Sequence, residues 1–318
     1  MQSDGFAHIP VLKAEVLELL LPAARGGVLV DCTLGGGGHA EAFLEADPDL
    51  LVVGLDRDDE ALEAVADKLS GFGDRLRPIK SNFADIEEAL HQAGIQSVSA
   101  VLYDLGVSSH QLDRPGRGFQ YRSGSPLDMR MDTSSPVRAA DIVNEYSQKD
   151  LASVIARFGE ERFASRVASA IVRRRAKQEF EDAGDLAEVI KEAIPAATRR
   201  TGPHPARRTF QALRIEVNQE LESLERSLDA SIRLLSTGGR LAAISYHSLE
   251  DRIVKRRLQA ASKGCTCPRD LPVCACGKEA EMRMLTKKAI RPSPEESHSN
   301  PRSDSGRLRG AEKLGKAS

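Results

Sequence analysis

The chain has 318 residues, which is enough for one large domain or two ordinary ones. Hydrophobic residues make up 41% and charged residues 29%, as in ordinary globular proteins, and an aromatic content of 4% without Trp argues against recognition by a platform of many stacked rings. The sequence lacks both an apolar run long enough for a membrane span and a signal-peptide pattern, so we expect a cytoplasmic protein without a membrane partner.

Strand and helix patterns alternate through the first hundred residues. Short apolar runs predict strands, and apolar residues three or four positions apart predict helices. The expected strands are 27–33, 50–58, 76–82 and 97–107, and the expected helices are 39–46, 58–73 and 84–94. Strands that alternate with helices of this length indicate βαβ units. We therefore expect an α/β fold with a doubly wound, mostly parallel sheet.

This alternation ends after Gly106. There follow an irregular segment (108–140), helical patterns (140–198) and a basic turn region (198–209). A long amphipathic helix (210–235) and a glycine-led strand (238–248) come next. The tail is expected to hold a helix from Leu249, a strand within 282–290 and a mobile Ser/Pro stretch near 292–305. The sequence thus predicts a main domain of residues 1–107 and 210–318, interrupted by a mostly helical subdomain at 108–209.

Charge is distributed unevenly, although the net charge is only -2. Residues 1–106 hold 7 Lys and Arg against 19 Asp and Glu, whereas residues 107–214 hold 19 against 14 and residues 251–318 hold 16 against 8. This asymmetry predicts one face for a cationic or neutral small ligand and another for a polyanion. Solvated surface charge is the alternative interpretation.

A glycine loop stands between the first expected strand and the first expected helix. Gly35-Gly36-Gly37-Gly38-His39-Ala40 satisfies the pattern G-x-G-x-x-G/A, which is typical of dinucleotide sites. Enzymes that use NAD and enzymes that use S-adenosylmethionine both place glycines there, together with a ribose-binding acid at the end of the second strand. The P-loop pattern is absent, because no lysine follows the glycines.

Acidic residues follow the expected strands, where an open α/β sheet binds its ligand. Asp31, Asp56 and Asp104 end the first, second and fourth strands, and Asp85 lies just beyond the third. Several carboxylates around one crevice would repel a pyrophosphate and would suit a sulfonium and an amino group, which favours S-adenosylmethionine over NAD. Each Asp could instead serve as a helix N-cap.

Long motifs in the chain resemble a known family. These motifs are HIPVL (8–12), GGGGH (35–39), LDRD (55–58), LYDLGVSSHQLD (102–113), RGF (117–119), PLDMRMD (126–132), GEERFA (159–164), HPARRTFQALRIEVNQEL (204–221), SYHSLEDRIVKR (245–256) and SGRLRGAEK (305–313). They are similar to motifs of the bacterial 16S ribosomal RNA cytosine-N4 methyltransferases, the small-subunit methyltransferase H family. The resemblance covers most of the chain.

The resemblance implies a class I methyltransferase fold with an inserted helical domain. It also implies S-adenosylmethionine as the methyl donor and, as the acceptor, a decoding-region cytidine of 16S rRNA within the small ribosomal subunit. The cofactor contacts that it implies are Gly37, Gly38, His39, Asp56 on the ribose, Phe83 near the adenine, Asp104 and Gln111. The oligomeric state is left open, with a homodimer as one option.

Methylation of a cytosine amine requires an acceptor for an N–H as positive charge develops, and Asp104 is our candidate for this catalytic role. Asp104 could instead contact only the cofactor. The motif [DNS]-P-P-[YF] of many amino-group methyltransferases is replaced here by Asp104-Leu105-Gly106-Val107, so Ser108, Ser109 or the insertion could grip the amine. Methylation at carbon 5 would need a cysteine nucleophile, and Cys32 lies on the cofactor side of the loop.

Basic residues of the insertion and tail are candidates for phosphate contacts. They are Arg114, Arg117, Arg122, Arg130, Arg207, Arg208, Lys255, Arg256 and Arg257. An ion pair of Arg130 with Asp128 or Asp132 is an alternative. His247 could contact the substrate or cap a helix. Four of the five cysteines, Cys265, Cys267, Cys274 and Cys276, could hold a structural zinc or remain free thiols, and our prediction includes no metal. An NAD-dependent oxidoreductase and a catalytically silent RNA-binding assembly factor are the competing interpretations.

Overall fold

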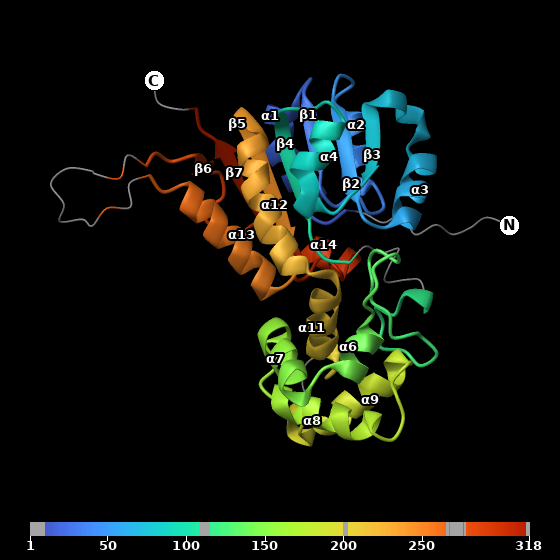
Figure 1. Cartoon of the computed structure of the whole chain (residues 1–318). Helices are drawn as coiled ribbons and strands as arrows, with labels where there is room; N and C mark the ends of the chain where they lie inside the picture. The colour runs from blue at the N-terminus through green and yellow to red at the C-terminus, as the bar shows by residue number, and fades with distance from the viewer. Residues whose placement is uncertain are drawn as a thin grey trace. The chain divides into compact units, whose positions relative to one another are not determined.

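The computed structural model of the protein describes residues 10–107, 115–199, 203–264, 267, 276 and 278–315. The chain divides into two compact units (Figure 1): unit 1 consists of Met1–Gly106 and Leu221–Ser318, and unit 2 consists of Val107–Glu220. The second boundary therefore follows Glu220, whereas the sequence suggested a boundary after residue 209. Across the described ranges, no helix combines the length and the apolar character that crossing a bilayer demands.

Unit 1 is built on a sheet whose described strands have the order β3-β2-β1-β4-β5-β7-β6 (Figure 1). The strands are β1 Val28–Asp31, β2 Leu51–Asp56, β3 Leu76–Lys80, β4 Val98–Asp104, β5 Leu235–Ser245, β6 Met282–Met284 and β7 Arg307–Lys313. Strands β1 to β5 pair in parallel, and β7 runs antiparallel between β5 and β6. Because the winding direction reverses between β1 and β4, the predicted doubly wound α/β fold is confirmed, and a ligand crevice is expected at this point.

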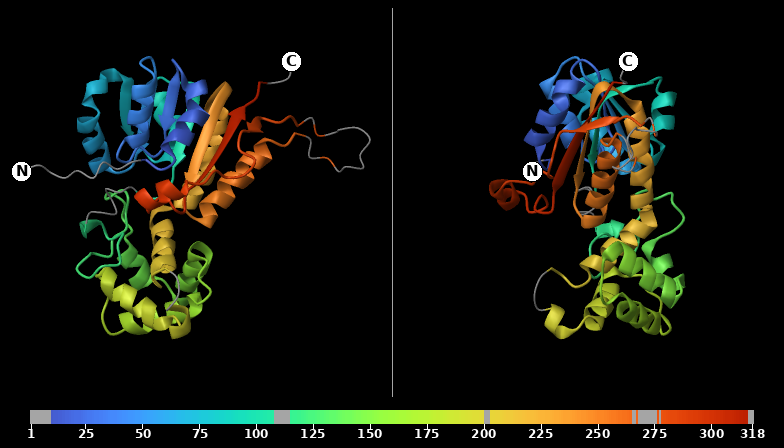
Figure 2. Two further views of the ribbon diagram at one scale, coloured as in Figure 1. Left: turned by 180° about the vertical axis from the view of Figure 1, so that it is seen from behind. Right: turned by 90° about the vertical axis from the view of Figure 1, so that its left-hand side faces the viewer.

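Helices cover both faces of this sheet because buried side chains alternate along each strand. Leu29 and Val52 face one apolar core, whereas their neighbours Val30 and Val53 face the other. The first core takes side chains from α1 (Lys13–Ala24), α2 (Gly38–Ala46) and α3 (Asp59–Lys68), and the second from α4 (Ile86–Gln92), α12 (Glu220–Leu234) and α13 (Ser248–Ala261). Figure 2 shows the two helical layers edge-on. The stretch expected to be mobile contains a further helix, α14 (Pro294–Ser299).

Unit 2 folds around an apolar core of its own, which extends from Phe119 to Leu213. Its helices are α6 Ala139–Glu145, α7 Gln148–Gly159, α8 Ala164–Arg175, α9 Ala183–Ala193, α10 Ala196–Arg199 and α11 Arg207–Asn218, with a short 3-10 turn at Pro115–Arg117. The described part of this unit is therefore mostly helical.

The single long helix expected over 210–235 is instead two helices, α11 and α12. Gln219, between them, has a left-handed backbone with φ of 50°. The side chain of the preceding Asn218 is buried, and it accepts the Met131 N–H at 2.8 Å and donates to the Met129 carbonyl at 2.7 Å. These tertiary hydrogen bonds satisfy a buried amide at the break, and helical periodicity does not report them.

Candidate active site

Three carboxylates end three neighbouring strands of unit 1. Asp31, Asp56 and Asp104 are the last residues of β1, β2 and β4, so they meet at the edge of the sheet where the strand order reverses. Asp85 does not join them. It lies in the turn Phe83–Asp85, and its exposed carboxylate pairs with Arg226 of α12 at 3.0 Å. Of the four acids that the sequence placed around one crevice, three therefore meet at this edge of the sheet and one does not.

The four glycines occupy different backbone environments. Gly35 and Gly37 have φ values of 48° and 70°, in the left-handed region that favours glycine. A Cβ on Gly37 would also lie 3.1 Å from side-chain atoms of Val65 and Leu69, and a Cβ on Gly38 would lie 2.6 Å from a Pro10 carbon. At Gly36, by contrast, a Cβ would meet nothing within 4 Å. The loop thus needs glycine at Gly37 for both conformation and space.

Asp56 holds the glycine loop against the end of β2. Its carboxylate accepts the Gly35 N–H at 2.8 Å and the Asp58 N–H at 3.0 Å. Burial raises the pKa of Asp56, and these two backbone hydrogen bonds oppose the rise. A carboxylate oxygen has two lone pairs, so Asp56 can bind the loop and still accept hydrogen bonds from vicinal hydroxyls.

Thr33 links the ends of β1 and β4. Its N–H donates to Asp31 Oδ1 at 3.1 Å, and its hydroxyl accepts the Asp104 N–H at 2.7 Å. The hydroxyl also lies 3.4 Å from Asp31 Oδ1, to which it donates. Asp31 is almost fully buried, and burial raises its pKa to about 7 against the lowering effect of the Thr33 N–H. The sequence reasoning missed Thr33, although an Asp side chain commonly accepts the backbone N–H two residues later in a turn.

Asp104 lies between a tyrosine and a histidine. The Tyr246 hydroxyl donates to Asp104 Oδ1 at 2.7 Å, and Nε2 of the buried His39 lies 3.7 Å from Asp104 Oδ2. The Asp104 side chain is 22% exposed. Burial raises its pKa to about 7, the Tyr246 hydroxyl opposes this rise, and the negative charge of Glu250 adds to it. A carboxyl group that is half ionised near neutral pH can act as a proton acceptor.

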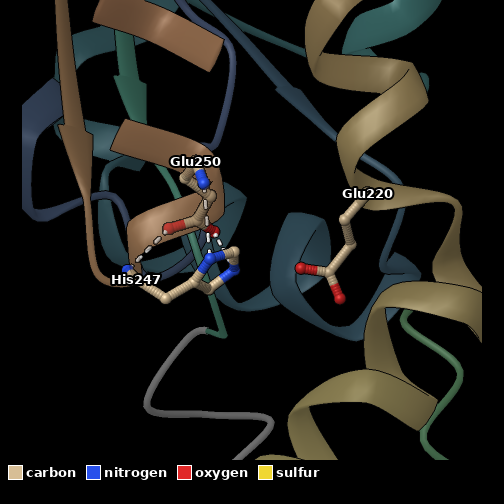
Figure 3. A group of neighbouring side chains, drawn as sticks. All are labelled: Glu220, His247 and Glu250. Atoms are coloured by element: carbon tan, nitrogen blue, oxygen red, sulfur yellow. Dashed lines mark hydrogen bonds and ion pairs between the residues drawn. The ribbon is translucent and has the colours of Figure 1, made fainter. Parts of the chain in front are cut away.

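Glu250 fixes the backbone that carries Tyr246. Its buried carboxylate accepts the N–H groups of Tyr246 at 2.8 Å and of His247 at 3.2 Å, and His247 in turn accepts the Glu250 N–H (Figure 3). This reciprocal arrangement caps α13, so His247 is a helix cap. Glu220, also drawn in Figure 3, binds Arg214 through both carboxylate oxygens. The sequence reasoning missed Tyr246 and Glu250, because no local pattern reports that β5 lies beside β4.

Phe83 lies beyond β3 in a turn capped by Asn82, whose side chain accepts the Ala84 N–H. Its half-buried ring contacts Tyr103 edge-on, with ring centroids 5.9 Å apart, and the Arg57 guanidinium lies 5.8 Å from its centroid. An aromatic ring at this end of the sheet can contact a planar base, so the adenine contact stays a prediction.

Several predicted residues cannot be assigned a place in the site. Gln111, Ser108, Ser109 and Arg114 lie outside the described residues, as do Cys265 and Cys274. Cys32 is described, and it is buried at the end of β1. Burial raises the pKa of its thiol well above the ordinary value, which does not suit a cysteine nucleophile.

The candidate phosphate-binding residues differ in their surroundings. Arg117 is buried and donates to the carbonyls of Arg130 and Met131, and Arg130 forms two 2.8 Å hydrogen bonds with Asp128. These two arginines hold the loop together, whereas Arg257 of α13 pairs with Asp229 of α12. The remaining described candidates are exposed: Arg122, Arg207, Arg208, Lys255 and Arg256.

Known proteins resemble the chain along most of its length. The sequence model of the MraW methylase family matches residues 5–314. A protein of Symbiobacterium thermophilum named ribosomal RNA small subunit methyltransferase H is 51% identical over 98% of this chain and 98% of its own length. Proteins of the same name from Carboxydothermus hydrogenoformans and Geotalea uraniireducens are each 50% identical, over 97% and 98% of this chain and 98% and 100% of their own lengths.

Proposed function

Because the chain belongs to the MraW methylase family, we propose that it transfers a methyl group from S-adenosylmethionine to N4 of a cytidine in the decoding region of 16S rRNA, within the small ribosomal subunit. The observation that carries the proposal is the identity of about half of all residues, over nearly the whole chain, to proteins named ribosomal RNA small subunit methyltransferase H. The site in unit 1 supports it through the chemistry of its side chains.

The residues of the site fit S-adenosylmethionine better than a phosphate-bearing nucleotide. The carboxylates at the ends of β1, β2 and β4 accept hydrogen bonds and attract cations, which suits ribose hydroxyls, an amino group and a sulfonium. Asp56 would bind the ribose, Phe83 would contact the adenine, and Gly37, Gly38 and His39 would line the loop side. The backbone at Gly36 leaves open space where a ligand can approach closely.

Asp104 would be the proton acceptor of the reaction. When bound, S-adenosylmethionine supplies an electrophilic methyl group on a positively charged sulfur. The cytosine amine is a weak nucleophile because its lone pair is delocalised into the ring, so an ionised Asp104 would accept its N–H as charge develops. Tyr246 would hold Oδ1 of this carboxylate through its 2.7 Å hydrogen bond, which leaves Oδ2 as the acceptor.

The deciding experiment adds labelled S-adenosylmethionine to small ribosomal subunits that lack the modification, followed by digestion and nucleoside analysis. We expect label in N4-methylcytidine with the wild-type chain and almost none with Asp104→Ala. Label in any other nucleoside would contradict the proposed reaction. Binding to the subunits without label would favour the RNA-binding assembly factor.

A further inference from the structure

Two aromatic side chains of unit 2 that lie far apart in the sequence stack on each other at its surface. The ring centroids of Tyr121 and His204 are 4.5 Å apart, and their planes differ by 8°. Both residues are exposed, Tyr121 at 40%. Among the described residues, only Tyr121 and Val137 are large hydrophobic side chains with this degree of exposure.

Contacts with Phe210 and with the backbone that follows His204 hold the pair in place. Tyr121 meets the buried ring of Phe210 edge-on, at 5.4 Å between centroids and 88° between planes, and Phe210 belongs to the apolar core of unit 2. His204 Nδ1 accepts the Ala206 N–H at 3.3 Å, and the His204 carbonyl accepts the Arg207 N–H at 3.0 Å. Two ordered rings are thus presented to solvent at little further cost in conformational entropy.

Two exposed arginines lie close to this aromatic pair in the sequence. Arg122 follows Tyr121 directly, Arg207 lies in the turn that begins at His204, and both side chains are exposed. Within the described part of the chain, neither arginine forms an ion pair with a carboxylate. An exposed aromatic stack with exposed arginines close to it in the sequence matches the way proteins bind single-stranded nucleic acid, by stacking on bases and pairing with phosphates.

We propose that Tyr121 and His204 form a stacking site for one nucleobase of single-stranded RNA, with Arg122 and Arg207 contacting the adjacent phosphates. The base would continue the stack on the ring face of His204 opposite Tyr121. Every base has a π-face, so the site would hold the strand without selecting a sequence. This proposal rests on the proposed RNA substrate, and it adds to that function a contact in unit 2 that involves no residue of the carboxylate site.

Fluorescence anisotropy with the full chain tests the proposal without a methyl donor. One probe is a labelled single-stranded oligocytidine RNA of about ten nucleotides, and the other is an abasic ribose-phosphate strand of the same length and charge. We expect the wild-type chain to bind the RNA on the order of tenfold more tightly than the abasic strand, and Tyr121→Leu and His204→Leu to lose most of this preference. Tyr121→Phe keeps the ring and should keep the preference.

Two further variants separate stacking from charge and from folding. Arg207→Gln should weaken both probes alike and reduce the slope of log affinity against log salt by about one. Val137→Ala alters the other large hydrophobic side chain that is exposed among the described residues, and it should not change the binding of either probe. Tyr121→Phe and His204→Phe provide the comparison if a leucine variant unfolds, because they preserve an aromatic ring.

Equal binding of the two probes by the wild-type chain would overturn the proposal, as would leucine variants that fold and retain the preference. The assay is independent of catalysis. A retained base preference together with no methylation of ribosomal subunits would refute the proposed function and leave the stacking site standing. Methylation without any base preference would do the reverse.

Discussion

Replacing Tyr246 by Phe removes the hydroxyl that donates to Asp104 Oδ1, and this change should shift the acidic limb of the pH–rate profile to higher pH. Burial sets the pKa of Asp104 at about 7, and the Tyr246 hydroxyl lowers it because it stabilises the ionised form. Without that hydroxyl the pKa rises. If the ionised carboxylate accepts the amine proton, the active fraction at a given pH falls.

The size of the shift follows from the energy of the lost hydrogen bond. A hydrogen bond to a charged group contributes about 1.5–3 kcal/mol, and one pKa unit corresponds to about 1.4 kcal/mol, so the limb should move up by about one to two units. At pH values below both pKa values the rate of the variant should be roughly 10- to 100-fold lower than that of the wild type, and at pH values well above both the two rates should be equal. His39, Glu250 and Asp31 also face this carboxylate and remain unchanged in the variant.

The assay measures kcat and KM for S-adenosylmethionine between pH 5.5 and pH 10, with small ribosomal subunits in excess. Tyr146→Phe is a matched control, because it removes a tyrosine hydroxyl that donates to Glu216 at 3.0 Å within unit 2. An acidic limb of kcat that stays in place in Tyr246→Phe would refute Asp104 as the proton acceptor. A limb that moves only in KM for the cofactor would assign Asp104 to cofactor binding alone.

Three further predictions concern the glycine loop and the carboxylates at the strand ends. Gly37→Ala should lower the free energy of unfolding by about 1–2 kcal/mol in a thermal melt, because a φ of 70° is unfavourable for alanine. Gly36→Ala is the control and should leave stability unchanged, since Gly36 does not have this conformation, and equal losses in the two variants would contradict the strain argument. Asp56→Ala should weaken S-adenosylmethionine binding by about two orders of magnitude or more in calorimetry, and unchanged affinity would rule out the ribose contact. Because Asp31 and Asp104 ionise near pH 7, the affinity for S-adenosylmethionine should rise from pH 6 to pH 8. The affinity for S-adenosylhomocysteine, which lacks the sulfonium charge, should rise less, and an identical pH dependence of the two would argue against an electrostatic contact with the sulfonium.

Local sequence was sufficient to predict the parts of the site that depend on neighbouring residues. Asp31, Asp56 and Asp104 each end an apolar run, and in a parallel sheet such positions share one edge. The same reasoning was wrong for Asp85, because it lies five positions after Lys80, the last residue of β3, and its side chain pairs with Arg226 on α12. Distance from the strand end, rather than residue type, separates the acids of the site from an acid of the surface.

Features that depend on distant residues were not predictable from local patterns. The contact between Tyr246 and Asp104 exists because β5 lies beside β4, far away along the chain. Similarly, α14 forms in a stretch rich in Ser and Pro because the Ser293 hydroxyl caps it, and its Glu296 accepts the Leu12 N–H at 2.8 Å. The composition of this stretch predicted mobility, because composition carries no information about the contact with Leu12.

The position of unit 2 in the chain has a consequence for the order of folding. Strands β4 and β5 are neighbours in the sheet, although residues 105–234 separate them in sequence, and an open loop of that length makes their pairing slow. The core of unit 2 extends from Phe119 to Leu213, so it can assemble without β5. We expect unit 2 to fold first and to convert a long flexible loop into a compact body. The sheet that carries Asp104 and Tyr246 would then be completed late, so the Asp104 carboxylate would gain its hydrogen-bond partner in one of the last steps of folding.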